Sequence, residues 1–133
     1  MKLVLKIVGV VLGLLIALFL LQAIASESGE VVVVTSQGAD GGTAETRLWI
    51  VDYEGDQWLR SGSPMAGWYQ NMQANPNIEV TRQDKTAGYV AIPKVEMRDT
   101  INAQLNAKYG WADDLIGVMF GREDAIPILL EPR

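Results

Sequence analysis

The residues with the clearest chemical potential are Arg60-Ser61-Gly62-Ser63-Pro64, which join a predicted strand to a predicted helix. Ser63 followed by Pro64 is typical of a helix start, with the serine as N-cap and the proline in the first turn. The free N–H groups of a helix N-terminus beside the Arg60 guanidinium would bind a phosphate. The alternative is an ordinary strand–helix turn that Ser63 caps.

Four aromatic side chains fall close to this segment in the sequence: Trp49, Trp58, Trp68 and Tyr69. Aromatic rings stack on flat ligands, but they also fill the cores of small domains. Trp68 and Tyr69 belong to a run of apolar residues at helical spacing, which suits either role. A ring-binding site and a core position therefore both stay open for them.

The chain has no cysteine and no histidine, which removes several classes of site. Thiol nucleophiles, disulfides, zinc sites built from Cys and His, and His-based triads are all excluded. The acidic pairs Asp113-Asp114 and Glu123-Asp124 are adjacent in sequence, which predicts solvated faces rather than converging carboxylates. Proton transfer must then use carboxylates, Tyr, Lys, water or a cofactor.

The whole chain has 133 residues and a formal net charge of −5, with its 11 basic residues scattered. This length suits one domain. Scattered basic residues in an acidic chain leave no electrostatic footprint for nucleic acid. We therefore expect no nucleic-acid partner.

Residues 1–26 are predicted to form an N-terminal membrane anchor or a signal peptide. Ile7–Leu21 has no polar side chain, and the apolar run reaches Ala25 if Gln22 is allowed. At 1.5 Å per residue this run is about 28 Å long, close to the roughly 30 Å of a bilayer core. Ala23-Ile24-Ala25 resembles a signal-peptide cleavage site, but the run exceeds the roughly 7–15 residues of a signal core. An uncleaved anchor is the favoured interpretation.

The charges that flank this segment predict its orientation. Lys2 and Lys6 precede it, and no further Lys or Arg occurs before Arg47. The positive-inside rule then places the N-terminus in the cytoplasm. Residues 27–133 would form a domain on the periplasmic or extracellular side of the cell membrane, tethered by a single span and in contact with membrane lipid.

The remaining sequence alternates between short strands and a few helices. β-branched runs, glycine-containing turns and helical spacing predict strands at 31–35, 46–53, 57–61, 77–82, 87–92 and 126–130, and helices at 63–74, 95–109 and 111–119. Sequential antiparallel strands with few helices favour a small barrel or an α+β sheet.

The segment Trp68-Tyr69-Gln70-Asn71-Met72-Gln73-Ala74-Asn75-Pro76, followed by a strand, resembles the deazaflavin-dependent nitroreductase and quinone reductase family. The ending Ile126–Arg133 is also similar. That family belongs with the pyridoxamine-phosphate-oxidase-like split β-barrels. The resemblance, over roughly 31–133, implies an α+β, mostly β fold: an FMN-binding-like split β-barrel with two or three helices, preceded here by one transmembrane helix.

The same resemblance implies a function. It implies a membrane-anchored oxidoreductase that binds an 8-hydroxy-5-deazaflavin coenzyme or FMN and reduces a quinone-like or nitro compound, and that forms a homodimer. The residues it implies for the cofactor are Arg47, Arg60, Ser61, Gly62 and Ser63 at the phosphate, and Trp68 and Tyr69 at the ring.

The loop after the first strand supports a different interpretation. Relatives usually read Gly-Arg-Lys-Ser/Thr-Gly there, and the basic residues help to bind the cofactor. Here Gly38–Gly42 has Ala39 and Asp40 at those positions. This loss favours a non-catalytic split-barrel module on the outer side of the membrane, with its cofactor site lost.

Overall fold

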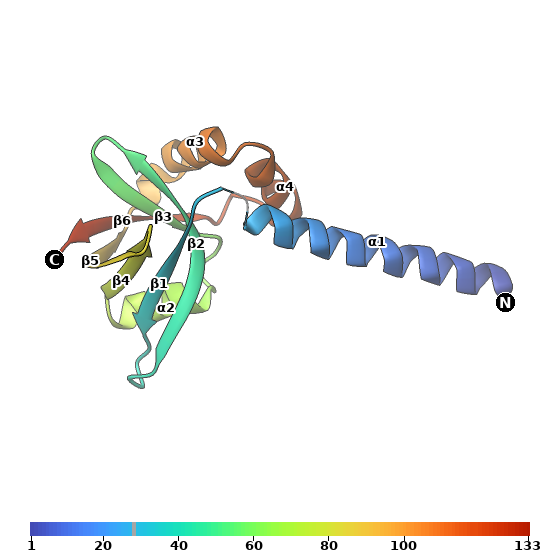
Figure 1. Cartoon of the computed structure of the whole chain (residues 1–133), viewed down its shortest axis with the longest axis horizontal. Coiled ribbons are helices and arrows are strands. Elements are labelled where there is room, and N and C mark those ends of the chain that lie inside the picture. Colours follow the sequence, from blue (N-terminus) through green and yellow to red (C-terminus); the bar gives the residue numbers. More distant parts are fainter. Residues whose placement is uncertain (28) are drawn as a thin grey trace.

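The computed structural model describes residues 1–27 and 29–133 of the chain. A long N-terminal helix leads into a compact mixed domain (Figure 1). The elements are α1 Lys2–Ser26, β1 Val31–Gln37, β2 Thr43–Tyr53, β3 Asp56–Ser61, α2 Gly67–Ala74, β4 Asn77–Arg82, β5 Lys85–Pro93, the 3-10 turn η1 Val95–Met97, α3 Arg98–Tyr109, α4 Trp111–Phe120 and β6 Ile126–Pro132.

The six strands of the described chain form a closed antiparallel barrel in the order β1-β2-β3-β6-β5-β4. The predicted hairpins β2–β3 and β4–β5 are confirmed, with Val51 opposite Trp58 and Val80 opposite Ala87. The ladder between β1 and β4 runs from Val33 to Thr35. β6, the last strand, closes the barrel between β3 and β5.

Apolar side chains fill the inside of this barrel. β1 has its buried side chains at alternate positions, as expected for a strand with one face toward a core. α2 lies against β1, and its buried face supplies Trp68, Tyr69 and Met72 to the same core. A second apolar cluster, formed with Ile101 and Leu105 of α3, lies between that helix and β2 and β3.

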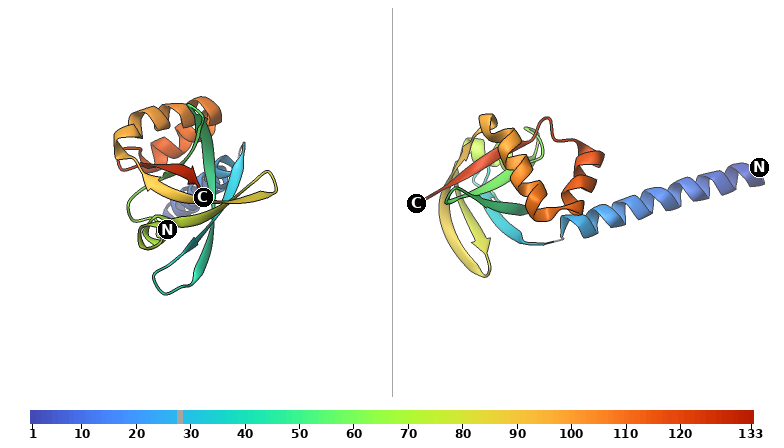
Figure 2. Two further views of the ribbon diagram at one scale, coloured as in Figure 1. Left: turned by 90° about the vertical axis from the view of Figure 1, so that its left-hand side faces the viewer. Right: turned by 90° about the horizontal axis from the view of Figure 1, so that it is seen from above.

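α1 projects away from the domain and is exposed along most of its length (Figure 2). Its 25 residues span about 37 Å, more than a bilayer core requires. Lys2–Ala25 is the one helix of the described chain that is long and apolar enough to cross a membrane. A signal sequence near the N-terminus also meets this criterion of length and apolarity, so both predicted roles for this segment stand.

The predicted helix start at Ser63-Pro64 is wrong. α2 begins at Gly67, with Ala66 as its N-cap. Ser63 instead closes a turn, because its hydroxyl accepts a hydrogen bond from the N–H of Met65 at 3.2 Å. Such short side-chain-to-backbone bonds compete with helix formation. A helix N-terminus is therefore not the origin of any anion site at Ser63.

The second helical region is divided, although the sequence predicted a helix over 95–109. Val95–Met97 forms a 3-10 turn before α3. Gly110 ends α3 as expected, with a φ of 59° that suits glycine. The chain then turns directly into α4, so that α3 and α4 pack on each other.

Candidate functional site

A pocket of about 170 Å³ lies between β2, the end of β3 and α4, and it is called the arginine pocket here. It is lined by Arg47, Leu48, Trp49, Arg60, Gly62, Ile116 and Arg122. β2 supplies three of these residues, β3 supplies Arg60 and is followed by Gly62, and α4 with the turn after it supplies the rest. Antiparallel pairing of Ser61 with Ile126 brings the segment before β6 beside the segment after β3.

Asp113 organises the charges beneath this pocket. It is buried, and its Oδ1 accepts a hydrogen bond from the Arg60 guanidinium at 2.6 Å and a second, shorter one from Arg122. Arg60 also donates to Asn102 at 3.2 Å. The prediction of a solvated acidic face is therefore wrong for Asp113, because two buried or half-buried guanidinium groups need a carboxylate counter-ion.

Burial and charge shift the pKa values of this pair. Burial and repulsion from Arg122 lower the pKa of Arg60, although the guanidinium remains protonated. Burial works to raise the pKa of Asp113, but its hydrogen bond with Arg60 and the charge of that group lower it overall. The pair is therefore ionised at neutral pH.

The arginine pocket has an excess of positive charge. At its outer edge Arg47 pairs with Glu27 at 2.7 Å, and both side chains are more than half exposed. Three guanidinium groups thus face two carboxylates, Glu27 and Asp113, which leaves one positive charge in excess. In addition, the Nε of Arg122 is buried without a hydrogen-bond partner in the described part of the chain. The pocket can accept an anion.

The seven predicted site residues separate into three groups. Arg47, Arg60 and Gly62 meet in the arginine pocket. Ser61 and Ser63 form the turn after β3, where the hydroxyl of the buried Ser61 donates to the carbonyl of Ser63 at 2.7 Å. The remaining predicted residues, Trp68 and Tyr69, are buried in the barrel core.

Sequence reasoning did not include Arg122 and Ile116 in the site. Arg122 is 62 positions from Arg60 in the sequence, and only strand pairing brings the two together. Trp49 was named as a possible ring-binding residue but was not assigned to the cofactor, although it follows Arg47 at a spacing of two on a predicted strand and so shares its face. Its ring stacks on Tyr109 with 4.2 Å between the ring centres.

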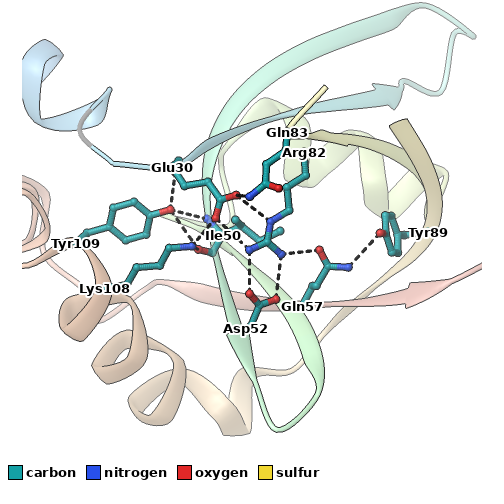
Figure 3. Close-up of polar contacts among 9 residues, drawn as sticks. All are labelled: Glu30, Ile50, Asp52, Gln57, Arg82, Gln83, Tyr89, Lys108 and Tyr109. Carbon is teal, nitrogen blue, oxygen red and sulfur yellow. Dashed lines mark hydrogen bonds and ion pairs between the residues drawn. The ribbon is translucent and has the colours of Figure 1, made fainter. Parts of the chain in front are cut away.

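A second polar group, the linker clamp, consists of Glu30, Asp52, Arg82, Lys108 and Tyr109 (Figure 3). The Arg82 guanidinium donates to both carboxylates, Glu30 at 3.0 Å and Asp52 at 2.8 Å. Lys108 donates to Glu30 at 2.7 Å, and the Tyr109 hydroxyl donates to the Glu30 carbonyl at 2.5 Å. These bonds fix the segment that follows α1 to the barrel and to α3.

The linker clamp also shifts pKa values. The hydrogen bond from Arg82, with a weaker contribution from Lys108, lowers the pKa of Glu30 to about 2. The Arg82 hydrogen bond also lowers the pKa of Asp52, and burial raises that of Tyr109. Because each charge is matched by a partner, the linker clamp has the character of a structural ion network rather than of an acid–base pair.

A larger pocket of about 400 Å³ lies at the hairpin end of β1 and β2. It is lined by Thr35, Ser36, Gln37, Thr43, Asn75, Asn77, Glu79 and Arg133. Amide and hydroxyl groups predominate, and the adjacent loop is closed by Asp40, whose carboxylate accepts a hydrogen bond from the N–H of Gly42 at 2.9 Å. This carboxylate disfavours a phosphate at the glycine loop.

The residues present fit the anionic end of a flavin-type cofactor better than they fit its ring. The unpartnered Arg122 Nε and the excess positive charge suit a phosphate in the arginine pocket. The pocket volume of about 170 Å³ is below the roughly 300–1,000 Å³ of typical small-molecule sites. A fused ring system would therefore extend outside it, along the wall that Trp49 forms.

No protein-family model matches the chain, and no curated protein matches it in sequence. Solved structures do match it. An F420-H2 dependent reductase is 23% identical with a TM-score of 0.59, over 76% of this chain and 93% of that one. The heme storage protein HutZ from Vibrio cholerae is 16% identical with a TM-score of 0.63, over 84% and 86%.

A further match names the barrel type. A protein from Listeria innocua that carries the name pyridoxamine 5′-phosphate oxidase is 14% identical, with a TM-score of 0.58 over 84% of this chain and 89% of that one. The domain is a split β-barrel. This confirms the fold expected from the sequence. At these identities the likeness is one of fold.

Proposed function

We propose that this split barrel is a membrane-anchored oxidoreductase that uses a flavin or deazaflavin coenzyme to reduce a quinone-like or nitro compound. The observation that carries the proposal is the arginine pocket, with its excess positive charge and the unpartnered Nε of Arg122. Among structures of this fold, an F420-H2 dependent reductase has a similar chain length and covers most of this domain.

Each pocket residue then has a role. Arg47 and Arg122 bind the phosphate-bearing end of the coenzyme, and Arg60, neutralised by Asp113, holds Arg122 in place through that shared carboxylate. Ser61 and Ser63 shape the turn around Gly62, and Trp49 provides an aromatic wall. The bound coenzyme supplies the hydride chemistry, while the protein supplies binding and orientation.

The anchor explains the choice of substrate. α1 is apolar on all sides and would hold the domain at the bilayer, where lipophilic quinones are concentrated. The ion pair of Arg47 with Glu27 places the edge of the arginine pocket beside the end of α1. A quinone-like acceptor would therefore reach the pocket from the membrane surface.

An absorbance spectrum and a cofactor titration of the detergent-purified full chain test this function. We expect a flavin or deazaflavin band, or saturable uptake of one of the two coenzymes. Arg47→Gln should weaken that binding about 10- to 100-fold, since a charge-assisted hydrogen bond contributes about 1.5–3 kcal/mol. Lys85→Gln, an exposed charge on the β4–β5 hairpin, is the matched control and should bind as the unaltered chain does.

A non-catalytic binding module on the outer side of the membrane is the second candidate. Asp40 in the glycine loop and the small volume of the arginine pocket favour it. In that case the purified protein is colourless and takes up neither coenzyme in titration. This result would remove the reductase proposal.

A further inference from the structure

α4 has apolar side chains that no part of the domain covers. Val118 is 87% exposed, Phe120 is 67% exposed and Trp111 is 55% exposed. Trp111 and Val118 are seven residues apart and so lie on one face of the helix, together with the exposed Asp114, whereas helical spacing puts Phe120, at the last position, on the other side. Exposed large apolar groups on one short helix, in a domain with a filled core, mark an interaction surface.

The position of this helix indicates what covers it. α4 packs against α1. In the views of Figures 1 and 2 it lies on the side of the domain from which α1 leaves, beside the end of that helix. Because α1 is exposed and apolar along its length, we expect lipid rather than water to surround it. The exposed apolar residues of α4 therefore belong to a helix that lies next to the end of α1.

We propose that α4 is a second membrane contact, lying in the interfacial layer of the bilayer with Trp111 and Val118 inserted. This inference rests on the proposed membrane anchor. A tryptophan is typical of that layer, since its ring is largely apolar and carries one polar group. A helix with an apolar face lies in this plane rather than across the bilayer.

The charges around α4 define the kind of lipid contact. Its exposed neighbours Asp114, Glu123 and Asp124 are acidic. Attraction to anionic headgroups therefore does not drive the contact, and burial of apolar surface does. We expect it in neutral phosphatidylcholine, and we expect it to be insensitive to added salt.

This contact would also orient the arginine pocket. Ile116 of α4 lines that pocket, and Arg122 follows the helix directly. With α4 in the interface, the pocket opens at headgroup depth rather than into bulk water. A lipophilic substrate would then reach it without leaving the bilayer surface.

The absence of cysteine allows a direct test on the full chain. Single variants Val118→Cys, Glu131→Cys and Leu14→Cys would be labelled with an environment-sensitive fluorophore and placed in phosphatidylcholine nanodiscs. Glu131 is exposed at the far end of β6 and serves as the control, and Leu14 reports the middle of α1. Quenching is measured with a lipid-borne nitroxide and with aqueous iodide at constant ionic strength.

The inference requires that the probe at position 118 be quenched several-fold more by the lipid nitroxide than the probe at 131, and several-fold less by iodide. Equal iodide quenching at 118 and 131, with position 14 in lipid, overturns the α4 contact but leaves the anchor. Protection of 118 from both quenchers indicates a contact with protein, such as a second copy, and also overturns it. A probe at 14 that iodide reaches overturns the anchor itself. Cofactor binding is read separately by absorbance.

Discussion

At the residue scale, Asp113 stabilises the arginine pocket from within. Its carboxylate lies between Arg60 and Arg122, and Arg60 is almost fully enclosed by protein. When one partner of such a buried pair is removed, the charge that remains cannot be solvated. Arg60 is therefore a poor probe of ligand binding, because its replacement also disturbs the fold. Replacement of the exposed Arg47 tests ligand binding without disturbing the buried ion pair.

Replacement of Asp113 by Ala should lower the free energy of unfolding by about 3 kcal/mol, since it leaves Arg60 buried with Asn102 as its remaining partner. The control is Asp114→Ala, at the adjacent exposed carboxylate, which should cost less than about 1 kcal/mol. Denaturant unfolding of the full chain in detergent, followed by circular dichroism, measures both. Equal losses for the two variants would contradict the role given to Asp113.

Glu30 should make stability depend on pH. Its pKa is lowered in the folded state from 4.5 to about 2, so its contribution is complete above pH 4.5 and is lost as the pH falls toward 2. Since its side chain is partly solvated, we expect a contribution of about 1–2 kcal/mol. In Glu30→Gln the loss of stability between pH 5 and 2 should be smaller by that amount. Parallel pH profiles of the two proteins would disprove this coupling.

At the element scale, the C-terminal end of α3 joins the segment after α1 to the barrel. The Tyr109 hydroxyl accepts a hydrogen bond from the N–H of Ile50 at 3.1 Å and donates to the carbonyl of Glu30. Its ring supports Trp49, one wall of the arginine pocket. α3 therefore couples the position of the anchor to the shape of the pocket.

Tyr109→Phe retains the stacked ring and removes the hydroxyl, which leaves the buried N–H of Ile50 without that partner. We expect a loss of about 1–3 kcal/mol in the free energy of unfolding. Tyr53→Phe is the control, because the Tyr53 hydroxyl makes no hydrogen bond within the described part of the chain, and it should change stability by less than about 0.5 kcal/mol. Thermal unfolding of the full chain in detergent compares them, and an unchanged Tyr109→Phe protein would exclude the bridging role.

At the scale of the whole molecule, a membrane anchor at α1 would determine which cofactor is available to the domain. The charge asymmetry around α1 predicts a cytoplasmic N-terminus and a domain on the outer side. A deazaflavin reductase would need its coenzyme on that side, whereas a binding module would not. The side of the membrane on which the domain lies and its cofactor content should therefore be measured together. The homodimer stays a prediction, which light scattering in detergent tests.

Two reporters fused after Arg133 test this orientation. An alkaline phosphatase fusion should be active, because that enzyme matures outside the cytoplasm. A green fluorescent protein fusion should not fluoresce, because that protein matures inside. Intact mass of the membrane-extracted protein should include residues 1–26. The opposite reporter pattern would reverse the proposed orientation. A mass that begins after Ala25 would identify a cleaved signal instead of an anchor.

The sequence predicted most of the fold and part of the site. Strand positions follow from β-branched runs and turn residues, so all six strands and both hairpins were found. Arg47, Arg60 and Gly62 line one pocket in the structure, and their role at a cofactor stays a prediction. The predicted helix start at Ser63 was wrong, because the serine hydroxyl bonds within a turn of its own. The sequence left both ring binding and core packing open for Trp68 and Tyr69, and the structure places the two side chains in the core.

The sequence alone determined the apolar helix, the absence of His and Cys chemistry and the positions of the strands along the chain. Composition and local periodicity encode these properties. Tertiary structure decided which charges meet. Arg60, Asp113 and Arg122 come together through the pairing of β3 with β6 and the packing of α4, over separations that no local pattern records. Burial likewise made Asp113 a structural counter-ion, while Asp114, one position later, remains exposed.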